Sequence, residues 1–293
     1  MQPADFEAHR RTARGPDGEV SYVDIGGGAV AVFVHGIGLN ARFWRNVVDA
    51  VRDERRCIAI DLPLHGHSAA RPGQDLSLPA LARAIEAVRA GVGAEAIDLV
   101  GNDTGGALAQ LYAAAHPERL RSLALTNCEA DGNIPAPAFQ GAVDAAARGE
   151  FAPRVHAAYR NLEELEPGRR PLAHGWEHPE RVDIDTMRSY MAPLAGTLEA
   201  ARQFERLLTS LDPAHLRAAE PGLRALAVPT LIAWGTADDH FDVAWAHWLR
   251  DTIPGAELVE LPGARLFFPD ERADELVPLL RKLWTARGEP RAV

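Results

Sequence analysis

The sequence predicts a doubly wound α/β fold, in which a mostly parallel sheet is covered by helices on both faces and carries an α-helical lid. Two observations support this prediction. Short apolar runs alternate with segments whose apolar residues recur every three or four positions. One long interval, from about 131 to 225, contains no such run and has the pattern of helices. The 293 residues, 47% of them hydrophobic, are enough for one large α/β core and an insertion.

Six short runs have the apolar and β-branched composition of buried strands. Continuous apolar runs, without the alternation of a half-exposed strand, are typical of parallel strands that are covered on both faces. The expected strands are 29–36, 57–63, 97–103, 123–128, 228–235 and 256–263.

Amphipathic helices are expected between these strands, because a connection between parallel strands must cross back over the sheet. Their apolar residues recur at the spacing of one helix face. The expected helices are 41–53, 78–92, 106–120 and 242–253.

The interval from 131 to 225 shows three helical segments, at 136–151, 153–165 and 185–211. A helical block between two strands of one sheet is best placed over the carboxyl ends of the strands, where open α/β sheets bind ligands. The prediction is therefore a core of 1–130 and 226–293 with a helical cap of 131–225.

Charge and composition exclude several classes of function. The chain has 31 Lys plus Arg against 41 Asp plus Glu, a net charge of −10, with both signs scattered along it. This argues against nucleic acid as a partner, and the absence of a basic amphipathic segment argues against membrane binding. The N-terminal residues lack the apolar centre of a signal peptide, so a cytoplasmic monomer or homodimer acting on a small molecule is expected. Cys57 and Cys128 lie in apolar runs as packing residues, and no metal or other cofactor is expected.

The segment Gly101-Asn102-Asp103-Thr104-Gly105 has the form of a nucleophile elbow, with Asp where many such turns carry Ser. The turn between strand and helix lifts the central side chain above the sheet, and glycines flank it because a Cβ there would clash. The alternative is that Asp103 only caps the following helix. A capping residue does not require glycines on both sides.

With these motifs the chain resembles the α/β-hydrolase superfamily over nearly its whole length. An Asp at the elbow is similar to the haloalkane dehalogenase and epoxide hydrolase branch. The resemblance implies that Asp103 attacks an alkyl carbon, that a histidine-activated water hydrolyses the resulting ester, and that the amides of Thr104 and Ile37 form the oxyanion hole. The other matching motifs are "HGIG" with Trp44, "DLPLHGHS", "AHPERLRSLAL" and "WGTADD".

The acid that orients the histidine has two locations in this branch, and both are filled here. Asp238 follows the strand expected at 228–235, and Glu129 follows the strand expected at 123–128. The resemblance favours Asp238 without excluding Glu129.

The histidine itself is missing from its usual place. The stretch "PGARLFFPDE" puts Leu266 at the position of the histidine, and no His follows Gly255. Leucine cannot accept a proton, so another residue must activate the water. His240, two residues after Asp238, is the nearest replacement. His35, His65 and His67 are more distant candidates, and His35 usually has a structural role in this motif.

The residues expected around the substrate are His35, Tyr159, Trp176, Tyr190 and Leu266. In dehalogenases of this branch a Trp follows the nucleophile and an Asn follows His-Gly, whereas this chain has Thr104 and Ile37. An efficient haloalkane dehalogenase is therefore not expected. Epoxide hydrolases use lid tyrosines to protonate the opening oxygen, a role open to Tyr159 and Tyr190.

Two functional hypotheses follow. The first is an enzyme with an Asp103 nucleophile that opens an epoxide or another C–O or C–X bond of a small or medium apolar molecule. The second is a non-hydrolytic binding protein, or a biosynthetic isomerase, lyase or cyclase, in which Asp103 acts as an acid or base. The intact elbow favours the first hypothesis, and the missing histidine favours the second.

Overall fold

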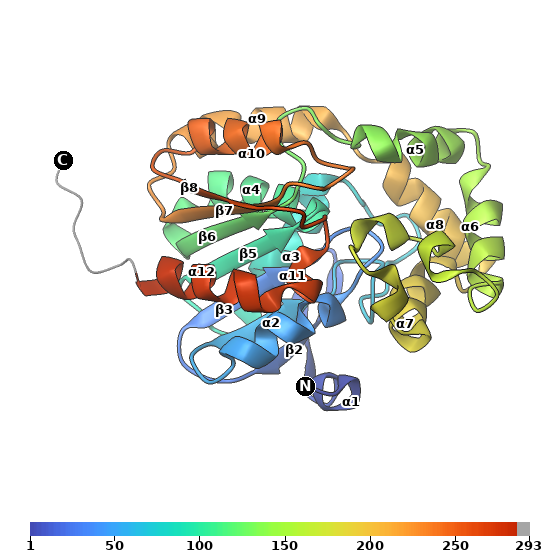
Figure 1. Cartoon of the computed structure of the whole chain (residues 1–293), viewed down its shortest axis with the longest axis horizontal. Coiled ribbons are helices and arrows are strands. Elements are labelled where there is room, and N and C mark those ends of the chain that lie inside the picture. Colours follow the sequence, from blue (N-terminus) through green and yellow to red (C-terminus); the bar gives the residue numbers. More distant parts are fainter. Residues whose placement is uncertain (286–293) are drawn as a thin grey trace.

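The computed structural model describes residues 1–285 and contains one eight-stranded sheet with the order β1-β2-β4-β3-β5-β6-β7-β8 (Figure 1). β1 and β2 are antiparallel to their neighbours, and the other pairs are parallel. The strands are β1 (Arg10–Gly15), β2 (Gly18–Ile25), β3 (Val30–Val34), β4 (Arg56–Ile60), β5 (Ile97–Asn102), β6 (Leu120–Thr126), β7 (Thr230–Gly235) and β8 (Glu257–Leu261).

The six strands expected from apolar runs are all present, which confirms the predicted α/β fold. The hairpin β1–β2 was not expected from the sequence. β1 has the sequence RRTARG and buries only Ala13, so it carries no apolar run that would mark it as a strand. Its position at the edge of the sheet explains why polar residues are tolerated there.

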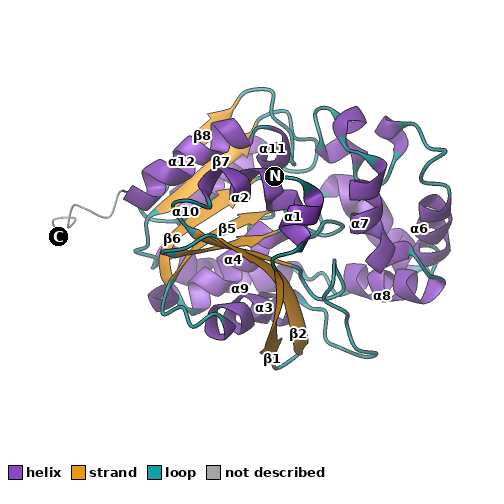
Figure 2. Cartoon of the chain, turned by 90° about the horizontal axis from the view of Figure 1, so that it is seen from below, coloured by secondary structure: helices purple, strands orange, loops and turns teal. Residues whose placement is uncertain are grey.

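Helices cover both faces of the sheet, as Figures 1 and 2 show. α2 (Arg45–Val51) and α12 (Ala273–Thr285) contact each other on one face. On the other face α4 (Thr104–Ala115) contacts both α3 (Leu78–Gly91) and α9 (Pro213–Arg224), and α10 (Val243–Thr252) lies beside α9. The sheet is thus the middle layer of three.

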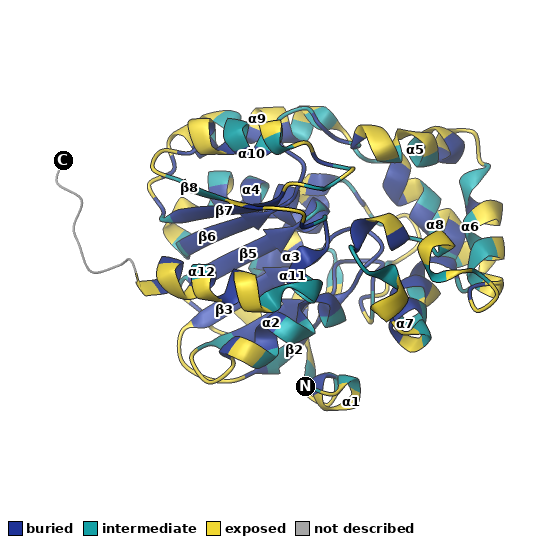
Figure 3. Cartoon of the chain, viewed as in Figure 1, coloured by how far each residue is buried: buried dark blue, intermediate teal, exposed yellow. Residues whose placement is uncertain are grey.

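The core of the molecule is the centre of this sheet. Every residue of β3, β5 and β7 is buried, whereas the edge strand β8 is largely accessible (Figure 3). Burial on both faces is the reason why the central strands are continuous apolar runs. Within residues 1–285, no helix is both long and apolar enough to cross a bilayer.

Between β6 and β7 the described chain is helical, as predicted, but its helices do not all lie in one place. α5 (Gln140–Ala147), α6 (Phe151–Arg160), α7 (Ile184–Ala195) and α8 (Leu198–Thr209) gather beside the sheet (Figure 1). α9 instead packs against α4 in the layer that covers the sheet. The helix expected over 185–211 is two helices, because Thr197 caps α8 by accepting a hydrogen bond from the Ala200 N–H at 3.1 Å.

Candidate active site

Asp103 occupies the sharp turn between β5 and α4. Its backbone has φ +54° and ψ −136°, a strained conformation for a residue with a Cβ. Its side chain makes no capping hydrogen bond to α4. The backbone is held by a hydrogen bond of 2.8 Å from the Asp103 N–H to the Asn127 carbonyl oxygen. The turn therefore presents the carboxylate instead of using it as a helix cap.

Glycines make room for this turn. A Cβ on Gly101 would lie 2.5 Å from the Gly105 carbonyl oxygen, and a Cβ on Gly105 would lie 2.2 Å from the Val34 carbonyl oxygen. The sequence pattern had indicated both. A third glycine, Gly36, was not singled out, although a Cβ there would lie 2.1 Å from Oδ2 of Asp103. The Asp103 carboxylate thus lies directly against the backbone that follows β3.

A small cavity of about 50 Å³ opens above the turn. A cavity of this size holds only a few water molecules. Its polar lining consists of Asp103, Thr104, Glu129 and His240, and no Lys or Arg is among its lining residues. The apolar lining consists of Ile37, Pro135, Ala136, Phe139, Leu172, Gly175, Phe241, Leu266 and Phe267.

Burial and neighbouring acids favour the protonated form of Asp103. Desolvation raises the pKa of Asp103 well above its usual range, and the charges of Glu129 and Asp238 raise it further. The Thr104 backbone N–H acts in the opposite direction, as an oxyanion-hole amide would.

Glu129 is the second acid of the cavity and is only 4% exposed. Its Oε1 accepts a hydrogen bond of 3.0 Å from the Thr104 hydroxyl, whereas Oε2 has no hydrogen-bond partner within the described residues. Burial raises the pKa of Glu129 to about 7, against the opposing effects of its hydrogen bonds and of His240. Near neutral pH this carboxyl therefore exists in both protonation states.

Asp238 and His240 lie together on the loop after β7. The Asp238 carboxylate accepts hydrogen bonds of 2.8 Å from Nδ2 of Asn127 and of 2.8 Å from the His240 backbone N–H. Nδ1 of His240 lies 3.4 Å from Oδ1 of Asp238, and the ring is 21% exposed where it lines the cavity. An imidazole beside a buried carboxylate thus shares the cavity with Asp103.

Leu266 lines the same cavity and is 3% exposed. Its carbonyl oxygen accepts a hydrogen bond of 3.0 Å from Nδ2 of Asn102, and the next residue, Phe267, donates its N–H to the Gly175 carbonyl oxygen at 2.8 Å. The backbone at the expected histidine position is therefore well anchored, and an aliphatic side chain faces the carboxylates.

The other histidine candidates do not reach the cavity. Nε2 of His35 accepts from the Leu62 N–H at 3.0 Å, and its Nδ1 lies 2.7 Å from the Gly36 carbonyl oxygen. His65 is bound in the same way to the backbone of Gly38 and Pro63. Burial lowers the pKa of His35 to about 4 and that of His65 to about 3. Both rings hold loops in place, so the expected substrate contact of His35 is corrected to a structural role.

The expected aromatic contacts of the lid also lie elsewhere. Tyr190 and Trp176 are buried, but they line a second cavity instead of the one at Asp103. Tyr159 is partly buried against the core on α6 and is not among the lining residues of either cavity. The reason is that α6 and α7 pack with α8, which sets the direction of their side chains. Among the described residues that line the cavity at Asp103, no tyrosine is present to protonate a leaving oxygen.

Sequence reasoning missed Asn127, which connects three parts of the site. Its side chain accepts from the Gly235 N–H at 2.6 Å and donates to Asp238, while its carbonyl oxygen binds the elbow. A polar residue at the end of an apolar strand was the available signal. Phe139 and Phe241, which also line the cavity, carried no signal of their own.

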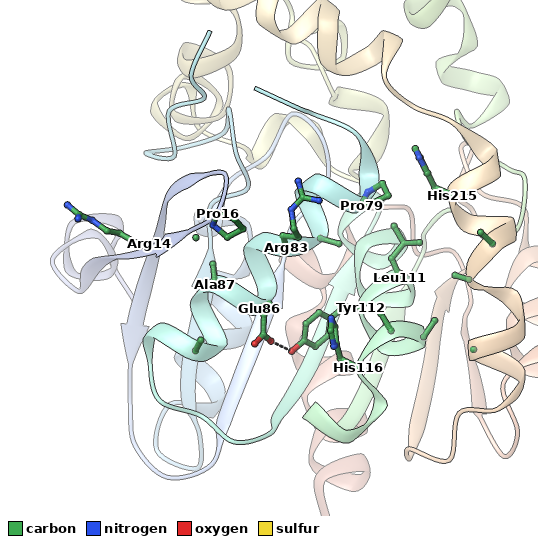
Figure 4. A pocket seen from close by; sticks show the side chains of 18 residues that line it. Arg14, Pro16, Pro79, Arg83, Glu86, Ala87, Leu111, Tyr112, His116 and His215 are labelled. Carbon is green, nitrogen blue, oxygen red and sulfur yellow. Dashed lines mark hydrogen bonds between the residues drawn. The ribbon is translucent and has the colours of Figure 1, made fainter. Parts of the chain in front are cut away.

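A larger groove of about 750 Å³ lies elsewhere, between α3, α4, α9 and the β1–β2 turn (Figure 4). Two of its labelled polar groups already have partners, since the Tyr112 hydroxyl donates to Glu86 at 2.7 Å and Arg83 pairs with Asp17. Nδ1 of His215 has no partner among the described residues. It shares no lining residue with the cavity at Asp103. Size alone does not make it the reactive site.

Comparisons with known proteins agree with this architecture. A family model described as alpha/beta hydrolase fold matches residues 30–272. Pimeloyl-(acyl-carrier protein) methyl ester esterase of Aeromonas hydrophila is 30% identical over 258 residues, which cover 84% of this chain and 91% of the relative. Haloalkane dehalogenase 2 of Mycobacterium bovis is 28% identical over 267 residues, which cover 88% of this chain and 89% of the relative. The structure of the haloalkane dehalogenase DatA from Agrobacterium tumefaciens C58 superposes with a TM-score of 0.78 at 22% identity, covering 94% of this chain and 96% of that one.

Proposed function

Because the chain belongs to the α/β-hydrolase fold family, we propose that it is a hydrolase in which the Asp103 carboxylate opens a carbon–oxygen or carbon–halogen bond of a small apolar molecule. One observation carries the proposal. Asp103, at a strained turn, shares its cavity with His240, which lies beside Asp238 while Leu266 fills the usual histidine position. Nucleophile, base and orienting acid would thus come from the ends of β5 and β7, which lie on either side of β6 in the sheet.

In the first step, an oxygen of Asp103 attacks the substrate carbon while the bond to the leaving oxygen or halide breaks. An ester of Asp103 forms. A leaving alkoxide takes its proton from Glu129, whose free Oε2 and raised pKa suit a proton donor. Glu129 would thereby do the work that lid tyrosines do in epoxide hydrolases, and for which no tyrosine is available among the described lining residues.

In the second step, His240 takes a proton from water as the water oxygen attacks the ester carbonyl carbon. The amides of Thr104 and Ile37 bind the oxyanion. When the ester bond breaks, the product oxygen takes the proton from His240. After loss of an alkoxide, the proton left on Asp103 returns to Glu129, and an epoxide and water have become a diol. After loss of a halide, that proton is released to the solvent with the halide, and the other product is the alcohol.

The raised pKa values of Asp103 and Glu129 support a second candidate function. Two buried acids without a Lys or Arg in their cavity can hold and pass a proton. Asp103 would then act as an acid or base in an isomerase, lyase or cyclase reaction, with no ester and no activated water.

A labelling experiment tests the proposal. The protein is incubated at pH 8 with propylene oxide or ethyl bromide, and peptides are analysed by mass spectrometry. We expect the alkyl mass on the peptide that contains Asp103, or turnover of the reagent, and loss of both in Asp103→Asn. High pH is chosen because the carboxylate must be ionised to attack. If neither labelling nor turnover is found with these and a wider electrophile panel, the nucleophilic function is refuted and the acid–base function is favoured.

A further inference from the structure

A second cavity, of about 220 Å³, lies between the core and the segment that leads into α7. The core contributes residues of the turn Ala41–Trp44, of α2 and of α11 (Phe268–Glu271). The opposite wall comes from 176–190. The titratable residues that line it are Arg42, Arg45, His178, Arg181, Asp183, Tyr190, Asp270 and Glu271.

Two of the three acids that face this cavity are already used by the protein. The Asp183 carboxylate accepts hydrogen bonds from the Thr186 N–H at 2.8 Å and the Thr186 hydroxyl at 2.7 Å. The Glu271 oxygens accept from the backbone N–H groups of Glu177 and His178, both at 2.7 Å. Their lone pairs are committed to neutral donors of the backbone and of a hydroxyl.

The third acid, Asp270, is committed in the same way. Its Oδ1 accepts from Nδ2 of Asn46 at 3.1 Å, and its Oδ2 accepts from the indole N–H of Trp176 at 3.2 Å. Burial raises the pKa of Asp270 to about 6, while the Trp176 N–H and the charge of Arg45 act in the opposite direction. None of the three acids lies within ion-pair distance of an arginine that lines the cavity, within residues 1–285.

The arginines are left without matching partners. Arg45 forms no ion pair in the described part of the chain, and its Nε and Nη1 are buried without hydrogen bonds. Arg42 has only long contacts, of 3.7 Å to Oε1 of Glu7 and 3.5 Å to the Thr186 hydroxyl. Buried guanidinium N–H groups without acceptors are costly, and an oxyanion in the cavity would supply the acceptors that they lack.

Tyr190 supplies an independent sign of a missing acceptor. The residue is 1% exposed, and its ring is stacked on the Trp176 ring, with 6.4 Å between the ring centres and 13° between the ring planes. The residue lines the cavity, and its hydroxyl has no hydrogen bond to any described residue. Buried phenol groups normally find a partner. Its hydroxyl therefore adds a third donor beside the two guanidinium groups that line this cavity.

We propose that this cavity is a binding site for a compact oxyanion, a carboxylate or phosphate group, held by Arg45 and Arg42 from the core and by the Tyr190 hydroxyl from the helical segment. Guanidinium groups match the planar oxygens of carboxylate and phosphate, and such charge-assisted hydrogen bonds are strong. The site is separate from the chemistry proposed for Asp103 and does not depend on it.

The two cavities share a wall. The Trp176 ring packs against Phe267 at 4.5 Å between ring centres, and Phe267 lines the cavity at Asp103. An anion between Arg45 and Tyr190 would therefore join the core to α7 directly behind the wall of the reactive cavity. We expect the bound anion to stabilise the folded protein by linkage.

Thermal unfolding of the full chain at pH 7.5 tests the site. Sodium phosphate, sodium acetate and sodium chloride are titrated at matched ionic strength. We expect a saturable rise in Tm with phosphate or acetate that chloride does not give, and the better of the two identifies the source of the oxyanion. If neither raises Tm beyond chloride, the cavity holds water only and the proposal is wrong.

Variants assign the effect to this cavity. Arg45→Gln should lower the affinity for the oxyanion, measured by calorimetric titration, by at least about tenfold. This is the expected effect of losing a charge-assisted hydrogen bond. Arg52→Gln changes an exposed arginine just after the same helix and should keep the parent affinity. Tyr190→Phe removes only the hydroxyl and should weaken binding severalfold, which keeps the test open should Arg45→Gln not fold. Parent affinity in both Arg45→Gln and Tyr190→Phe would place any bound anion elsewhere and overturn the site.

Discussion

Three carboxylates, Asp103, Glu129 and Asp238, meet around the reactive cavity with only one imidazole among them. Burial and the neighbouring carboxylates raise the pKa values of Asp103 and Glu129. His240 is the one imidazole among the described residues that line the cavity, and imidazole is the most frequent general base in enzymes. The proposed hydrolysis therefore depends on this side chain more than on any other single group.

Replacing His240 tests this dependence. His240→Ala should leave formation of the Asp103 ester intact and slow its hydrolysis by about 10²- to 10⁴-fold, the usual contribution of a general base. The adduct should then accumulate in the mass spectrum. His247→Ala, at an exposed position on α10, is the matched control and should behave like the parent. Equal turnover of His240→Ala and parent would exclude His240 as the base.

Leu266→His, made in the His240→Ala background, extends the argument to the vacant position. The Leu266 backbone is anchored by Asn102, so an imidazole there would face the same cavity. We expect the new histidine to restore hydrolysis of the accumulated Asp103 ester. The measurement is the decrease of the adduct mass with time. Far-ultraviolet circular dichroism checks that the double variant is folded. A folded double variant that keeps its adduct would show that this position no longer supports hydrolysis.

At the scale of elements, the elbow between β5 and α4 determines how the nucleophile is presented. The start of α4 lies too close to β3 for a Cβ at Gly105, and too close to the end of β5 for a Cβ at Gly101. This close approach also brings the Thr104 N–H next to the Asp103 carboxylate. Strand, turn and helix therefore form one unit whose geometry cannot relax locally.

Gly105→Ala tests the cost of this close approach. The new Cβ would lie 2.2 Å and 2.5 Å from the carbonyl oxygens of Val34 and His35, so β3 or α4 must shift. We expect urea unfolding to show a loss of about 2 kcal/mol or more in the free energy of unfolding. The control is Gly141→Ala in α5, where a Cβ meets open space, and it should gain about 0.5–1 kcal/mol. Equal stability of the two variants would contradict the packing described.

For the whole molecule, the buried acids link stability to pH. The pKa of Glu129 rises from 4.5 to about 7 on folding, so the folded protein binds this proton more tightly than the unfolded chain does. The contribution of Glu129 to stability is therefore full below pH 4.5 and is lost as pH rises through 7. Asp103, whose pKa is also raised, acts in the same direction.

Glu129→Gln should make stability less dependent on pH. We expect the free energy of unfolding, measured in urea at pH 5.5 and pH 8, to fall less with pH in the variant than in the parent, by up to about 1.4 kcal/mol per pH unit. Glu199→Gln changes an exposed acid at the start of α8 and should keep the parent slope. A parent-like slope in Glu129→Gln would mean that Glu129 is ionised in the folded protein throughout this range.

The sequence by itself determined those features that rest on local patterns. Continuous apolar runs identified the central strands, because burial on both faces demands them. The glycines around Asp103 predicted the elbow, because a strained turn needs glycines at fixed positions. The sequence also indicated that Leu266 takes the usual place of the histidine. The sequence did not predict β1, because an exposed edge strand does not need a continuous run of apolar residues.

Only the tertiary structure decided which side chains share a cavity. Glu129 and His240 follow two different strands, and the sheet order β5-β6-β7 brings them to the cavity at Asp103, with Asp238 beside His240. The same packing turns Tyr190 and Trp176 away, into the second cavity with Arg45. The physical reason is that the direction of a side chain depends on the contacts of its whole element with distant parts of the chain, and no local pattern of residues encodes those contacts.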